Sequence, residues 1–97
     1  MIIVHDIFVC KPGNASKLAK LFKEVMGDGK EFVNVMTDMT GQFNRVIMVS
    51  QYADLSAYEK SWEEFQKDEE KMKRMKEKMA NYTDMYLTGS REIYKVW

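Results

Sequence analysis

The sequence has 97 residues, and its 15 basic and 15 acidic side chains cancel to a formal net charge of zero. This length is typical of one domain, expected over residues 1–97, and the balanced charge argues against a nucleic-acid partner, which would favour a basic excess. A single cysteine excludes an internal disulfide and favours a reducing compartment, and no apolar run approaches the ~20 residues that cross a bilayer, so we expect a cytoplasmic protein without a membrane partner.

The chain opens with a predicted strand over residues 2–10. Both alternating sets of its side chains are mainly apolar, which indicates a central strand covered on both faces. Pro12 ends the strand because proline lacks a backbone donor. A short amphipathic helix follows, with apolar side chains at helical spacing: Leu18, Leu21, Phe22 and Val25.

The middle of the chain predicts a hairpin and then a long helix. Strand-like runs over 32–39 and 45–52 flank turn residues at 40–43. Asp54 is the expected N-cap of the helix, because its carboxylate can accept from the free amides of the first turn. Apolar side chains recur along the helix at steps of three, four or seven: Leu55, Tyr58, Trp62, Phe65, Met72, Met75, Met79 and Tyr82.

Two irregularities are expected in the second half of the chain. Glu69 interrupts the apolar stripe, so the long helix should kink or break near Lys67 and Asp68. A last strand is expected within 84–97, with a bulge or bend at residues 88–90, where Gly89 interrupts the pattern.

The order strand, helix, strand, strand, helix, strand predicts the ferredoxin-like α+β fold, a four-stranded antiparallel sheet with helices on one face. The opposite face is also apolar, and soluble monomers avoid a large exposed apolar patch, so we expect a homodimer through the sheet faces. The residues expected on the outward face are Val4, Phe8, Ile47 and Val49. Asp6 is expected in the dimer interior, paired with Arg45 or Arg91.

Three segments resemble the NIPSNAP-like branch of the dimeric α/β-barrel superfamily. They are the opening from Met1-Ile2 to Lys11-Pro12-Gly13, the stretch Gly41-Gln42-Phe43-Asn44-Arg45-Val46, and Tyr52-Ala53-Asp54-Leu55-Ser56-Ala57-Tyr58-Glu59. The resemblance implies two sheets packed face to face in a homodimer, and a pocket between sheet and helices in each subunit. Related families include cofactor-free monooxygenases, polyketide cyclases and haem-degrading enzymes, so the fold does not fix the function.

His5 is the only histidine and the weak candidate for catalysis. Its position on the first strand, expected to face the helices, is similar to that of a pocket histidine in plant polyketide cyclases. Those enzymes use a second histidine, which this chain lacks. The alternative is a partly buried, hydrogen-bonded histidine without a chemical task. The expected ligand-binding set on the helix side is His5, Met48, Tyr58, Trp62 and Met85.

Other chemistries have less support. One histidine and one cysteine cannot make a metal site without several carboxylates, so neither a metal nor a cofactor is expected. Cys10 has no histidine beside it and is interpreted as unreactive. Three functions follow: a dimeric protein that binds a small apolar or aromatic molecule, a cofactor-independent monooxygenase or cyclase-like enzyme that uses His5, or an interaction module that acts as a homodimer.

Overall fold

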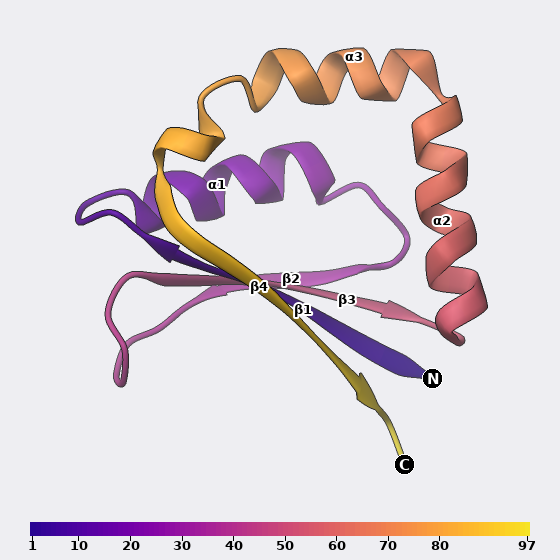
Figure 1. Ribbon diagram of the computed structural model, residues 1–97, viewed down its shortest axis with the longest axis horizontal. Helices are drawn as coiled ribbons and strands as arrows, with labels where there is room; N and C mark the ends of the chain where they lie inside the picture. The colour runs from indigo at the N-terminus through magenta and orange to yellow at the C-terminus, as the bar shows by residue number, and fades with distance from the viewer.

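The computed structural model describes all residues from Met1 to Trp97 and has the predicted ferredoxin-like architecture (Figure 1). Its sheet is antiparallel with the strand order β2-β3-β1-β4, so β1 and β3 are central. The elements are β1 (Ile2–Cys10), α1 (Ala15–Met26), β2 (Phe32–Thr37), β3 (Arg45–Tyr52), α2 (Leu55–Lys67), α3 (Glu69–Lys78), the 3₁₀ turn η1 (Tyr82–Asp84) and β4 (Tyr86–Lys95).

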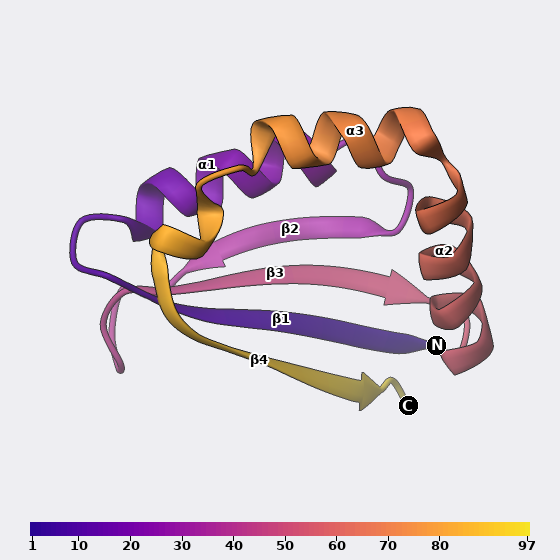
Figure 2. The ribbon, with the colours of Figure 1, turned by 45° about the horizontal axis from the view of Figure 1, so that its top comes forward.

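The helices lie on one side of the sheet and leave the other side open (Figures 1 and 2). α1 contacts β2 and β3 directly, whereas α3 packs against α1 and α2. α2 turns sharply away from α3 and stands beside the end of β3 (Figure 2). From this position, the side chains of Tyr58 and Trp62 on α2 reach Arg91 on β4.

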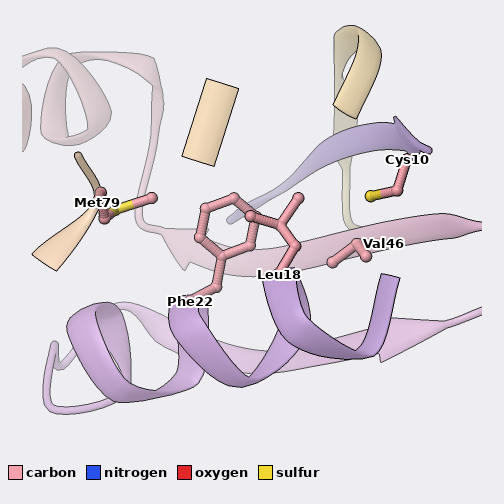
Figure 3. Packing of buried hydrophobic residues seen from close by; sticks show 5 residues of the cluster. All are labelled: Cys10, Leu18, Phe22, Val46 and Met79. Carbon is pink, nitrogen blue, oxygen red and sulfur yellow. The ribbon is translucent and has the colours of Figure 1, made fainter. Parts of the chain in front are cut away.

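The hydrophobic core lies between α1 and the two central strands. Leu18 and Phe22 rise from α1 toward the sheet and the end of α3 (Figure 3). Their spacing puts both on the buried stripe of the helix, as predicted. The five buried members of this cluster are Cys10, Leu18, Phe22, Val46 and Met79.

Two aspartates start the second pair of helices. The Asp54 carboxylate accepts a hydrogen bond from the Ala57 amide at 2.8 Å and caps α2, as predicted. Asp68 accepts from the Lys71 amide at 3.1 Å and caps α3. The predicted break near Lys67 and Asp68 is confirmed, because Asp68 has an extended conformation that ends one helix and begins the next.

The last strand differs from the prediction. β4 runs without a break through Thr88, Gly89 and Ser90, and its irregularity comes earlier. The pairing register shifts where Val9 lies opposite Thr88 and Cys10 lies opposite Tyr86. Gly89 lies opposite Phe8 in the β1–β4 register, next to the Phe8 ring, and does not mark a bend.

An ion pair ties α3 to α1. Lys78 Nζ donates to Glu24 Oε1 at 2.7 Å, and this hydrogen bond lowers the pKa of Glu24 below its usual range. A carboxylate whose pKa is lower in the folded than in the unfolded state stabilises the fold above its unfolded-state pKa, which is about 4.3 for glutamate. This stabilisation is lost as the pH falls through the folded-state pKa. We expect Glu24→Gln to lower Tm slightly at neutral pH, and the difference from wild type to vanish on acidification through this window. Calorimetric Tm values across the pH range test this; a difference that persists in acid contradicts it.

Cys10 is a core residue in which burial raises the pKa of the thiol. Its side chain is 2% exposed, and thiolate is the reactive form, so both access and ionisation oppose reaction. We expect an aromatic disulfide reagent to modify the native protein at least about a hundredfold more slowly than the urea-unfolded chain. Equal rates in the two states would contradict the burial of this thiol.

Candidate functional site

The two faces of β1 are the reverse of the prediction. Val4 is fully buried, and Phe8 packs on Phe22 and Tyr86 of the helix side with ring centroids 5.0 Å apart in each pair. The expectation that Val4 and Phe8 face outward is therefore wrong. Ile47 and Val49 do face away from the helices, on β3, as predicted. Because strand side chains alternate, the residues on the open face of β1 are Ile3, His5, Ile7 and Val9.

His5 therefore does not face the helices or approach Tyr58 and Trp62. It is partly exposed on the open face, where its ring meets the edge of Tyr94 from β4 at a centroid distance of 5.2 Å. The Tyr94 hydroxyl hydrogen-bonds to the Glu92 carboxylate, which raises the pKa of Tyr94. His5 thus belongs to the surface expected to meet a second copy.

Asp6 occupies the position on the helix side that was expected for His5. Its side chain is buried on a central strand, and Arg91 lies directly opposite on β4. Arg91 Nε donates to Asp6 Oδ1 at 2.5 Å, and this hydrogen bond raises the pKa of Arg91. Asp6 is not in a dimer interior, which corrects the prediction, but its pairing with one of the two expected arginines is confirmed. Arg45 instead pairs with Asp38 at 3.3 Å.

Two adjoining aromatic rings from α2 lie against one side of Arg91. Its guanidinium carbon lies 5.8 Å from the ring centroid of Tyr58 and 5.8 Å from that of Trp62. The spacing of four residues puts the two rings on one face of α2, and they meet edge to face at 6.5 Å. Cation–π attraction is strongest where water is partly excluded, so this arrangement holds the guanidinium in place.

We call Asp6, Arg91, Tyr58 and Trp62 the Arg91 cluster. Three elements build it: β1 supplies the carboxylate, β4 the guanidinium and α2 the two rings. The aromatic row extends to Tyr52 at the end of β3, whose ring lies 5.0 Å from Tyr58, and burial raises the pKa of Tyr52. The cluster thus combines a neutralised ion pair with a continuous aromatic wall.

The Arg91 cluster has unused hydrogen-bonding capacity. The hydroxyl of Tyr58 is buried without a hydrogen-bond partner. Arg91 uses only Nε toward the protein, and its side chain remains 48% exposed. Trp62 is 37% exposed beside it. A buried unpaired hydroxyl is uncommon in native proteins and calls for a specific explanation, such as a bound molecule.

The other predicted ligand-binding residues are distributed differently. Met48 lies opposite Asp6 on β3 and packs against the core. Met85 lines a separate open hollow of about 370 Å³ between α1 and the segment after α3, together with Leu21 and Tyr82. The structure therefore brings together Tyr58 and Trp62 from the predicted set, with Met48 on the adjoining strand, but neither His5 nor Met85.

Asp6 and Arg91 are the members of the cluster that the predicted binding set lacked. The available signal was a lone carboxylate within an apolar strand, which requires a cation in the fold. No three histidine, cysteine, aspartate or glutamate side chains come together in a way that could hold a metal ion. None of the helices combines the length and apolar character needed to span a bilayer.

Comparison with known proteins gives a consistent picture of the fold. The sequence model of the NIPSNAP family matches residues 6–86. An uncharacterized NIPSNAP domain protein from Burkholderia xenovorans is similar in structure, with a TM-score of 0.81, 12% identity and coverage of 100% of this chain and 95% of that one. A NIPSNAP family protein from Agrobacterium tumefaciens has a TM-score of 0.74 and 15% identity over 97% of this chain and 90% of that one.

A more distant similarity is to an antibiotic biosynthesis monooxygenase. Its TM-score is 0.58 at 11% identity, with coverage of 100% of this chain and 99% of that one. No curated protein matches the sequence. At such low identities the similarity to solved structures shows the fold alone.

Proposed function

The chain belongs to the NIPSNAP family, and on this premise we propose that it binds a small aromatic or apolar molecule at the Arg91 cluster, between the sheet and α2. The observation that carries the proposal is the placement of a half-exposed arginine against the adjoining rings of Tyr58 and Trp62, beside a buried hydroxyl without a partner. Small-molecule sites combine apolar walls with a few convergent polar groups, and this cluster has both.

Direct titration tests the proposal. We expect naphthamide, a neutral aromatic probe, to bind the wild-type protein saturably in isothermal titration calorimetry. Trp62→Ala removes one wall and should weaken binding by at least about tenfold, since an aromatic stacking contact contributes about 0.5–1.5 kcal/mol beyond the area it buries.

Tyr94→Phe is the matched control, because Tyr94 is an aromatic residue on the opposite face of the sheet. Its affinity for naphthamide should equal that of wild type. Absence of saturable binding of any aromatic probe by wild type, or equal weakening by both variants, would overturn the proposed site.

The enzyme alternative based on His5 has less support. His5 and the Arg91 cluster lie on opposite faces of the sheet, so the histidine cannot act on a molecule bound beside Trp62. A molecule bound at the cluster would meet the exposed guanidinium of Arg91. This group can orient a ligand by hydrogen bonds, which supports binding rather than catalysis by His5.

We further propose that the protein is a homodimer through the open face of the sheet, as the interaction-module alternative also requires. This face carries exposed or partly exposed apolar side chains from all four strands, and such a patch favours a partner. They are Ile3, Ile7, Val9, Met36, Ile47 and Tyr94. The single free thiol, Cys10, supports a reducing compartment such as the cytoplasm.

A further inference from the structure

We infer that the molecule bound at the Arg91 cluster carries a carboxylate, which the free Nη groups of Arg91 hold while its aromatic or apolar body lies against Trp62. The inference rests on the proposed function and adds the chemical class of the ligand. Arginine presents five N–H donors in a planar fork and has no acceptor, so its unused donors require an acceptor from outside.

The hydrogen bond to Asp6 fixes which donors are unused. Nε is engaged with Asp6 Oδ1, and this is the only hydrogen bond that the Arg91 side chain makes to the protein. The Nη end of the fork therefore remains available, on a side chain that is half exposed. Two parallel N–H groups at this end match the two oxygens of a carboxylate in a bidentate pair.

The sheet and the rings hold this fork before a ligand arrives. Asp6 is 7% exposed on a central strand, directly opposite Arg91 in the β1–β4 register, so its position is rigid. Tyr58 and Trp62 restrict the guanidinium from α2. A preorganised arginine loses less conformational freedom on binding, which leaves more of the interaction free energy for affinity.

The charge of the cluster favours a monoanion. Asp6 already balances Arg91, and Arg91 is the only basic residue among the four members. A carboxylate adds one negative charge to this neutral pair, whereas a phosphate ester adds up to two. The second charge would have no basic partner in the cluster and would be repelled by Asp6.

The aromatic wall defines the rest of the ligand. Trp62 offers partly exposed ring surface next to the guanidinium, and the unpaired Tyr58 hydroxyl lies in the same cluster. A carboxylate attached to a flat apolar body can therefore satisfy Arg91 and cover Trp62 at once. A small polar acid such as acetate would leave the ring surface uncovered.

Isothermal titration calorimetry with naphthoate and naphthamide tests the inference, because the two probes differ mainly in charge. We expect wild type to bind naphthoate at least about tenfold more tightly than naphthamide, the ratio expected when a hydrogen bond becomes charge-assisted. Naphthyl phosphate forms the third arm and should bind more weakly than naphthoate.

The variants remove the fork without leaving a buried charge. Asp6→Asn/Arg91→Gln replaces both charges by amides and should bind the acid and the amide equally. Arg91→Lys keeps the charge but loses the planar fork, and should lower the preference for naphthoate. Arg45→Gln, which breaks the Arg45–Asp38 pair on the hairpin, is the control and should leave the preference unchanged.

The outcomes separate this inference from the proposed function. Binding of no probe by wild type overturns both. If wild type binds naphthoate and naphthamide equally, or if the double variant keeps the preference for naphthoate, only the assignment of the ligand as a carboxylate is overturned. Tighter binding of naphthyl phosphate than of naphthoate assigns the site to phosphate esters and overturns the stated ligand class. If the double variant does not fold, the Arg91→Lys variant provides the test. A preference of Arg91→Lys for naphthoate over naphthamide that equals the preference of wild type overturns the inference.

Discussion

Ile7→Asp should give a folded monomer, whereas Phe8→Asp should unfold the protein. The two residues are neighbours on β1, but their side chains lie on opposite faces of the sheet. Phe8 is partly buried and packs on Phe22 and Tyr86, so aspartate there would lose these contacts and place an unpaired carboxylate against the core. Loss of the ring costs up to about 3–5 kcal/mol, and the partly desolvated charge adds to it, against a total stability of about 5–15 kcal/mol.

Ile7 is only partly buried in the single chain, opposite Ile47 in the β1–β3 register. An aspartate at position 7 of the open face can stay hydrated in a monomer. In the proposed dimer the same carboxylate would be desolvated against the partner sheet. The two copies would also bring like charges into one interface, and both effects oppose association.

Light scattering after size exclusion at micromolar concentration measures the molar mass of Ile7→Asp, and far-ultraviolet circular dichroism shows whether Phe8→Asp folds. Wild type should have twice the mass of one chain, and Ile7→Val, which keeps the apolar surface, should match it. A monomeric wild type, or an Ile7→Asp variant that keeps the dimer mass, would contradict the proposed interface. A folded Phe8→Asp variant would contradict the assignment of the β1 faces.

The order of elements could be predicted because each leaves a local signal. The Asp54 cap, the helical spacing of Leu18 and Phe22, and the break at Asp68 all depend on residues a few positions apart. These local signals are enough to choose the ferredoxin-like order. They carry no information on which side of a central strand the helices will lie.

The faces of β1 could not be predicted for that reason. Ile3, Ile7 and Val9 are as apolar as the residues that alternate with them, so periodicity gives no preference between the two faces. The cross-strand partners determine which face of β1 lies toward the helices. Asp6 requires a cation, and Arg91 lies opposite Asp6 only in the register of the folded sheet. Because His5 was assigned to the helix side on resemblance alone, the two faces of β1 were predicted the wrong way round.

Part of the candidate site could be predicted from the sequence. Tyr58 and Trp62 share a helix face by their spacing, and α2 holds that face toward the sheet. Met85 was misplaced because it follows η1, whose turn directs it toward α1. Arg91 was recognised as a possible partner of Asp6, but its position against the two rings depends on contacts among three separate elements.

The two members of the ion pair should differ in their effect on stability. Arg91→Gln leaves Asp6, whose side chain is 10% exposed, without its cation, and should lower the free energy of unfolding by about 1–3 kcal/mol at neutral pH. Asp6→Asn leaves Arg91 half exposed and able to turn toward water, so it should cost less than about 1 kcal/mol.

Urea unfolding at neutral pH measures this asymmetry. The Asp6→Asn/Arg91→Gln double variant should be more stable than Arg91→Gln alone, since neither amide buries a charge. Equal losses from the two single variants at neutral pH would show that the Asp6 carboxylate is hydrated. The guanidinium of Arg91 would then lack the rigid anchor on β1 that holds its fork against the two rings.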